Sequence, residues 1–130
     1  EFGACNMSVK SLLPQGCRYT PSDIVKRNPD FLNCDLNEEI PFDLSAYDTA
    51  VLSGVLEYVY DIDKVFKQFP ENLKNILLSY SCEDISNANR LENGWLSDYS
   101  KKEMDAVFEK YDYQTLLNHV VLLPETYLNL

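Results

Sequence analysis

The sequence predicts an α/β domain built on a mainly parallel sheet with helices on its faces. Two apolar runs, at 50–52 and 76–78, are typical of buried strands, and the residues between them carry a helical pattern. A strand, a helix and a strand in this order indicate a parallel pair joined by a crossover helix. With 130 residues, 45% of them hydrophobic, we expect a single domain over 1–130.

The region before residue 37 predicts one short helix and two short strands. The segment 7–13 places its apolar residues on a rough helical face, and Pro14 ends it. Extended segments follow at 17–25 and 30–36, separated by a turn-rich stretch that contains an Asn-Pro pair. Each extended segment carries an aspartate near its end.

The middle of the chain predicts a strand, a helix and a second strand. The apolar run within 47–56 indicates a central strand covered on both faces. Apolar residues at helical spacing predict a helix over 61–70, which a proline closes, and 74–81 repeats the buried-strand pattern. We expect the two strands to be adjacent, with Val51 and Leu77 buried.

The last third predicts a long loop, a helix and a C-terminal pair of strands. The stretch 82–100 is polar without a clear period, and loops of that length are often functional. Ser100 precedes Glu103 by three residues, a capping-box pattern that predicts the start of a helix ending near 110. Two β-rich runs on either side of Pro124 predict an antiparallel edge to the sheet.

The charge of the chain excludes several classes of partner. The formal net charge is −10, and no local cluster of Lys and Arg offsets it. Such a chain repels nucleic acids and anionic lipid surfaces. No apolar run approaches the roughly 20 residues that span a bilayer, and the amino end has no signal-type segment. We therefore expect a cytoplasmic protein with no nucleic-acid and no membrane partner.

The cysteines predict neither a disulfide nor a metal site. They stand at Cys5, Cys17, Cys34 and Cys82 without a Cys-x-x-Cys pair, and His119 is the single histidine. Because Cys17 and Cys34 each border an apolar stretch, we expect buried or half-buried reduced thiols.

Five motifs, in the order in which they occur, resemble those of one enzyme family. They are EFGACN, YTPSDIV, FLNCDLN, DTAVLSGVLEYVYD and NILLSYS. Together they are similar to the class I S-adenosylmethionine-dependent methyltransferases, and the resemblance covers almost the whole chain. It implies a Rossmann-like sheet, S-adenosylmethionine as cofactor and methyl transfer to a small-molecule acceptor. Bacterial proteins of this general pattern often modify sugars or lipid-linked small molecules.

The resemblance also implies a set of cofactor-binding residues at the strand ends. Glu1 and Gly3 match the acidic-x-Gly start of the family's first motif, where a glycine lets the backbone approach the cofactor. Asp23 lies 23 − 3 = 20 residues beyond Gly3, close to the roughly 20-residue spacing of a ribose-binding acid in Rossmann-like sites. The rest of the implied set is Asp35 and Leu36 beside the adenine, and Ser53 and Gly54 at the methyl-transfer pocket.

Each of these positions also has a purely structural interpretation. Asp23 is suited to a turn or an N-cap, Asp35 to a solvated loop, and the small residues 53–54 to a turn of the chain. The functional interpretation of Asp23 is favoured because Asp35 follows the next strand in the same way.

The catalytic residues are left open by the sequence. Methyl transfer mainly requires that the two reactants be positioned and water excluded, so a base is optional. His119 is one candidate base, although a lone histidine in an apolar stretch is more often structural. Tyr58 is the other candidate; it stands where many members of the family carry a histidine, so that candidate base of the family is absent from this chain. Trp95 is a candidate wall of the acceptor pocket, with ordinary packing as the alternative.

The chain departs from the family pattern at its start. Ala4 and Cys5 follow Gly3 where further glycines are usual, and the apolar first strand of the family would lie upstream of Glu1. The motifs therefore predict a sheet that lacks most of its first strand, with residues 1–2 either native or a cloning scar. We expect the exposed strand edges to pair between copies as a homodimer or higher oligomer. A non-catalytic methyltransferase-like module that acts by association is the alternative function.

Overall fold

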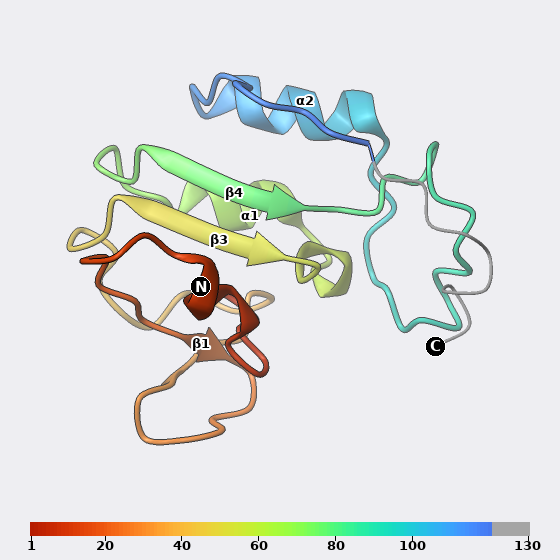
Figure 1. Cartoon of the computed structure of the whole chain (residues 1–130). Coiled ribbons are helices and arrows are strands. Elements are labelled where there is room, and N and C mark those ends of the chain that lie inside the picture. The colour runs from red at the N-terminus through yellow and green to blue at the C-terminus, as the bar shows by residue number, and fades with distance from the viewer. Residues whose placement is uncertain (121–130) are drawn as a thin grey trace.

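The computed structural model describes residues 1–120 as four short strands and four helical segments (Figure 1). The strands and the two α-helices are β1 (Ser22–Asp23), β2 (Leu32–Asn33), β3 (Thr49–Ser53), β4 (Asn75–Ser79), α1 (Ile62–Lys67) and α2 (Lys101–Lys110). Two 3₁₀ segments, Ser8–Leu12 and Leu56–Tyr58, complete the set. The elements predicted from the sequence are all present up to residue 110, but the first two strands and the helix α1 are shorter than expected.

All strand pairings in the described part of the chain are parallel. β1 pairs with β2, and β3 pairs with β4 in the register Val51 to Leu77. Phe2 joins the two pairs, because it forms one parallel bridge to Ser22 and another to Leu52. The order across the sheet is therefore β2, β1, Phe2, β3, β4. The expected mainly parallel α/β architecture with adjacent β3 and β4 is confirmed.

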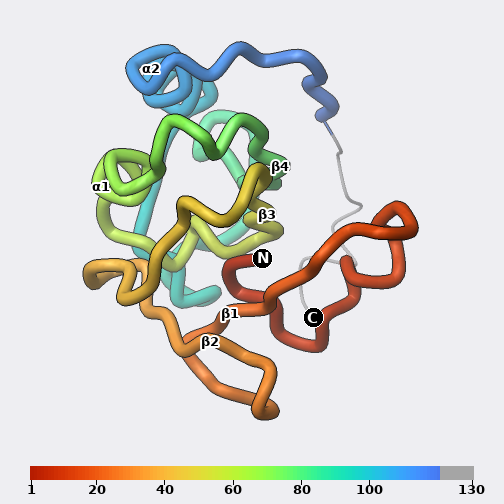
Figure 2. Tube along the Cα trace, turned by 90° about the vertical axis from the view of Figure 1, so that its left-hand side faces the viewer, coloured from red at the N-terminus to blue at the C-terminus, as the bar shows by residue number. Residues whose placement is uncertain are grey.

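One face of the sheet carries the core. Ala50 and Leu52 of β3 are buried against apolar residues of both α-helices. In α1 these include Val65 and Phe66, and Asp61 caps the helix by accepting a hydrogen bond from the Lys64 N–H at 3.2 Å. Both helices lie on the same side of β3 and β4 (Figure 2).

The other face of β3 and β4 is more open than the sequence predicts. Leu77 is 59% exposed and Val51 is only half-buried. The prediction that both side chains are buried is therefore wrong for Leu77. Among the described residues β4 ends the sheet, and its outward-facing positions carry no helix, so an apolar run there does not imply burial on two faces.

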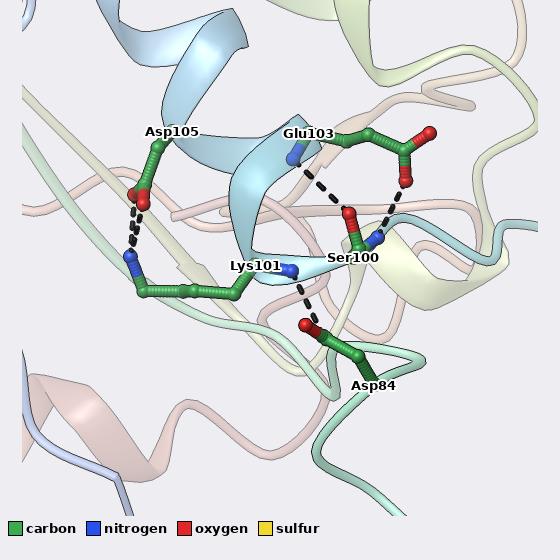
Figure 3. Close-up of polar contacts among 5 residues, drawn as sticks. All are labelled: Asp84, Ser100, Lys101, Glu103 and Asp105. Carbon is green, nitrogen blue, oxygen red and sulfur yellow. Dashed lines mark hydrogen bonds and ion pairs between the residues drawn. The ribbon is translucent and has the colours of Figure 1, made fainter.

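The helix α2 begins where its capping box predicts (Figure 3). Ser100 Oγ accepts a hydrogen bond from the Glu103 N–H at 3.2 Å, and Glu103 Oε2 accepts one from the Ser100 N–H at 2.7 Å. Asp84 adds a further contact, since its Oδ1 accepts from the Lys101 N–H at 2.9 Å. Two otherwise unpaired N–H groups of the first turn are thus satisfied locally, and Asp84 satisfies a third.

The antiparallel edge predicted for the C-terminal region is not found in the part that the structure describes. Residues 113–120 contain no strand, and the second β-rich run, after Pro124, lies outside the described residues. No helix in the described part is long and apolar enough to cross a membrane.

Candidate functional site

Three of the predicted cofactor residues, Gly3, Asp23 and Ser53, lie at one edge of the sheet. In parallel strands the carboxyl ends meet at the same edge, where ligands bind in open α/β sheets. Gly3 follows Phe2, Asp23 ends β1, and Ser53 ends β3. The parallel pairing thus brings these three positions to the same edge, as the sequence predicts.

Gly3 occupies a position that only glycine fits. Its φ is +64°, in the left-handed region. A Cβ at this position would lie 2.6 Å from Val55 Cγ2, which is too close for any side chain. The loop then continues through Cys5 and Met7, which also have positive φ values of 47° and 58°. Gly3 therefore permits close packing of the first loop on the segment after β3.

Asp23 is joined directly to this first loop. Its Oδ2 accepts a hydrogen bond from the Cys5 N–H at 2.8 Å, and its Oδ1 accepts a longer one from the Val25 N–H at 3.4 Å. The residue is 9% exposed. Since each carboxylate oxygen has two lone pairs, Asp23 keeps unused acceptor capacity at the edge of the sheet.

The predicted residues Asp35 and Leu36 lie in a turn after β2, together with Asn37, which was not a candidate from the sequence. Asp35 Oδ1 accepts from the Asn37 N–H at 2.9 Å, so Asp35 closes a local turn. Asn37 in turn bridges to the segment after β3: its Nδ2 donates to the Tyr58 carbonyl at 3.0 Å and its Oδ1 accepts from the Tyr60 N–H at 2.8 Å. Leu36 is 7% exposed and belongs to the core.

The end of β3 is tied to the end of β4. The Gly54 N–H donates to Ser79 Oγ at 2.9 Å, and Gly54 has a φ of +61° with open space around its Cα. Ser53 is exposed. The two small residues leave this part of the edge accessible.

A buried glutamate connects the same edge to the long loop. Glu57 is 3% exposed, its Oε1 accepts from the Ser81 N–H at 2.8 Å, and its carbonyl accepts from the Leu96 N–H at 2.7 Å. In the described part of the chain its Oε2 is buried without a hydrogen-bond partner. A buried carboxylate oxygen of this kind is a position for an ordered water or another donor.

Arg90 holds the predicted loop in place. Its guanidinium donates to the Ser97 carbonyl at 2.7 Å, to the Ser81 carbonyl at 2.7 Å and to the Tyr80 hydroxyl at 3.1 Å. It also lies over the ring of Trp95, 5.0 Å from the centroid. Neither Glu57 nor Arg90 was a candidate from the sequence. An arginine and a tryptophan within one polar loop are the signal that could have suggested this contact.

The remaining candidates from the sequence are Glu1, Tyr58 and His119. The Glu1 side chain accepts a hydrogen bond from the Tyr19 hydroxyl, and burial together with this bond raises the pKa of Tyr19 above its usual value. Tyr58 is 48% exposed, and its own carbonyl is the group that accepts the hydrogen bond from Asn37 Nδ2. His119 is exposed in a segment without regular secondary structure after α2.

The cysteines are free thiols with two kinds of environment. Cys34 and Cys82 are buried, and burial raises the pKa of both thiols, that of Cys34 to about 11. Cys5 and Cys17 are exposed. The expectation of a buried or half-buried Cys17 is therefore wrong, because the chain around it lies in an exposed turn after the first 3₁₀ segment. Within residues 1–120 no three His, Cys, Asp or Glu side chains are grouped as a metal site.

Comparisons of the chain with protein-family models, curated proteins and solved structures gave no significant match.

Proposed function

We propose that this chain is the cofactor-binding part of an S-adenosylmethionine-dependent methyltransferase that acts on a small-molecule acceptor. The observation that carries the proposal is the contact between Asp23 and the Gly3 loop. The Cys5 N–H donates to Asp23 Oδ2 at 2.8 Å, beside the central position of a parallel sheet. A carboxylate next to a glycine loop at the carboxyl edge is the arrangement that a ribose diol and a cationic cofactor tail require.

The chemistry of the edge fits the cofactor in three respects. Asp23 offers a carboxylate with free lone pairs to the ribose, and Asp35 lies after the next strand for the adenine side. Ser53 and Gly54 leave space at the end of β3. S-adenosylmethionine supplies an already activated methyl group, so these residues would bind and orient the reactants and need not remove a proton. Sugars and lipid-linked small molecules are the acceptor classes that the sequence resemblance suggests.

Calorimetric titration with S-adenosylmethionine tests the proposal. Asp23→Asn keeps the shape of the side chain and its contact with Cys5 but removes the charge, so it should weaken binding by on the order of 1.5–3 kcal/mol, roughly tenfold or more. Asp30→Asn is the matched control, because Asp30 is exposed in the turn before β2, away from the carboxyl edge. Equal affinity of the parent and Asp23→Asn would contradict the ribose assignment.

A second function, a non-catalytic module that acts by association, is favoured by different observations. The first loop continues as Ala4 and Cys5 where glycines would admit a cofactor tail, and Ala4 is buried. Leu77 is exposed on the last strand of the sheet in the described part. The same titration with S-adenosylmethionine separates the two functions. Binding that weakens in Asp23→Asn supports the methyltransferase. No detectable heat of binding at millimolar cofactor supports the non-catalytic module.

A further inference from the structure

The loop 82–99 contains an asparagine followed directly by a glycine, Asn93 and Gly94, a pair that occurs nowhere else in the sequence. Both residues are exposed, and the space that a Cβ of Gly94 would take is open. Because glycine has no side chain to hinder it, its backbone nitrogen can reach the side-chain amide of the residue before it. The pair therefore places an amide carbon and an unhindered nitrogen within reach of each other.

The reaction between these two groups needs only water. The Gly94 nitrogen loses its proton to water and bonds to Asn93 Cγ. The bond between Cγ and Nδ2 breaks, and ammonia leaves and takes up that proton as ammonium. Water then opens the resulting cyclic imide at either carbonyl, which gives aspartate or isoaspartate, and in isoaspartate the main chain runs through Cβ and Cγ. Nothing is oxidised or reduced, and one amide becomes one carboxylate.

The fold engages the attacking nitrogen of Gly94. The Gly94 N–H donates to the Leu91 carbonyl at 3.1 Å, and the Trp95 N–H donates to the Arg90 carbonyl at 2.8 Å. This is the bond pattern of a Schellman motif, in which the glycine takes a left-handed conformation, and Gly94 has a φ of +70°. The nitrogen is thus held by a carbonyl on the opposite side of the turn.

The amide of Asn93 is engaged in the same turn. Its Nδ2 donates to the Asn89 carbonyl at 2.9 Å, and its backbone N–H donates to the same carbonyl at 3.1 Å. The attacking nitrogen and the leaving amide therefore each have a hydrogen-bond partner other than the reacting group. The reaction requires that these bonds break, which means that the turn must open.

Arg90 connects this turn to the sheet. Its carbonyl accepts the hydrogen bond from the Trp95 N–H, and its guanidinium donates to the Ser81 carbonyl, the Ser97 carbonyl and the Tyr80 hydroxyl. Opening of the turn moves the backbone that carries this guanidinium. The frequency of opening therefore depends on how firmly Arg90 holds the loop to the residues after β4.

We propose that Asn93 and Gly94 form a self-modification site, and that release of the loop 82–99 from the sheet controls its rate. Isoaspartate at this position adds a carbon to the main chain between Arg90 and Trp95, so their hydrogen bond cannot form again in the same register. Both products add a negative charge to a chain whose net charge is already −10. A transient opening thus becomes a lasting change of the loop, whatever ligand the carboxyl edge binds.

Peptide mass spectrometry of the protein during storage in neutral buffer tests the site. Acid should accumulate at Asn93 faster than at Asn87, an exposed asparagine of the same loop that precedes alanine. Arg90→Lys should speed the reaction at Asn93 by about tenfold or more, because the loop loses hydrogen bonds and opens more often. Arg27→Lys, in the exposed turn before β2, is the matched control and should react at the rate of the parent.

Each alternative result of this experiment overturns a stated part of the proposal. No acid at Asn93 in either the parent or Arg90→Lys would overturn the site. Equal rates at Asn93 in these two proteins would overturn control by the loop. An equal acceleration at Asn87 in Arg90→Lys would show that unfolding of the whole chain controls the reaction, and would overturn it as well.

The emission of Trp95 provides a second readout. As isoaspartate accumulates in the parent, the emission should shift to longer wavelength in proportion, because the indole leaves the guanidinium of Arg90 that lies 5.0 Å from its centroid. Asn93→Gln keeps an amide but must form a larger ring, so its emission should stay constant over the same time. Acid at Asn93 without any shift of the emission would overturn the conclusion that the reaction releases the loop.

Discussion

The guanidinium of Arg90 lies over the ring of Trp95 and also connects the loop 82–99 to the residues that follow β4. Its three nitrogens donate to the Ser81 carbonyl, the Ser97 carbonyl and the Tyr80 hydroxyl. One side chain therefore fixes the path of the polar segment 82–99 against the carboxyl edge of the sheet. The fixed geometry of a guanidinium makes this arrangement specific to arginine.

Replacing Arg90 by lysine should release this loop. Arg90→Lys keeps the charge but cannot reproduce three hydrogen bonds in one plane, so we expect a loss of roughly 1.5–3 kcal/mol in the free energy of unfolding. Trp95 is the only tryptophan of the chain, so its emission reports on the same loop and should shift to longer wavelength. Arg27→Lys, in the exposed turn before β2, is the control. If both variants have the emission and stability of the parent, Arg90 does not hold the loop.

Gly3 and Gly54 provide a matched pair for separating steric clash from backbone strain. Their φ values are +64° and +61°, but a Cβ at Gly3 would meet Val55 at 2.6 Å while the surroundings of Gly54 are open. Alanine at either position bears a left-handed strain of about 1–2 kcal/mol. Gly3→Ala should therefore be more destabilising than Gly54→Ala by about 1–3 kcal/mol in urea unfolding, the usual cost of overpacking. Equal losses would mean that Val55 moves aside freely.

The sequence predicted the parts of this fold that local patterns determine. The capping box of Ser100 and Glu103 determines where α2 begins, and both of its hydrogen bonds form. The run Thr49–Ser53 is a strand, next to β4 as expected. These features depend on neighbours in the sequence and on the strand-helix-strand order, which can be read without knowing the tertiary structure.

Burial and long-range contacts were not predictable in the same way. Leu77 lies in a run of apolar residues that has the same local pattern as a buried strand. It is exposed because, within residues 1–120, no element covers this face of β4. Likewise, Glu57 and Arg90 meet at Ser81 from distant parts of the chain. Asp23 lies at the carboxyl edge of the sheet, where its spacing from Gly3 led us to expect it, but nothing local indicated its hydrogen bond with Cys5.

The pH dependence of stability should include a contribution from Asp63. Its carboxylate accepts from Lys110 Nζ at 2.7 Å and from the Tyr111 hydroxyl at 2.9 Å, which joins α1 to the end of α2. The Lys110 hydrogen bond is the main cause that lowers the pKa of Asp63 from its ordinary value of 3.8. A carboxyl group whose pKa is lower in the folded protein than in the unfolded chain stabilises the fold at pH values above its pKa in the unfolded chain. This stabilisation is lost as the pH falls through the pKa of the folded protein.

Asp63→Asn should consequently lower the free energy of unfolding at pH 7 but not at pH values well below 3.8. Because the pair is partly exposed, the difference at pH 7 should not exceed about 1 kcal/mol, and added salt should reduce it. Asp98→Asn, with its carboxylate in the exposed loop before α2, serves as the control. A difference between parent and Asp63→Asn that stays constant from pH 7 to pH 2.5 would exclude this ionic contribution.

The last prediction concerns self-association through the sheet. β4 ends the sheet in the described part of the chain, and Leu77 projects from it with 59% of its surface exposed. An exposed strand of this kind offers unpaired N–H and C=O groups to a second copy. The net charge of −10 opposes association, but charges farther apart than roughly 8–10 Å are screened at physiological ionic strength.

We expect sedimentation equilibrium at micromolar concentration to detect a dimer or higher oligomer. Leu77→Lys should weaken it, since an edge lysine disfavours pairing, whereas Leu91→Lys in the exposed loop should not. A single 15.0 kDa species for the parent would show that the edge stays unpaired.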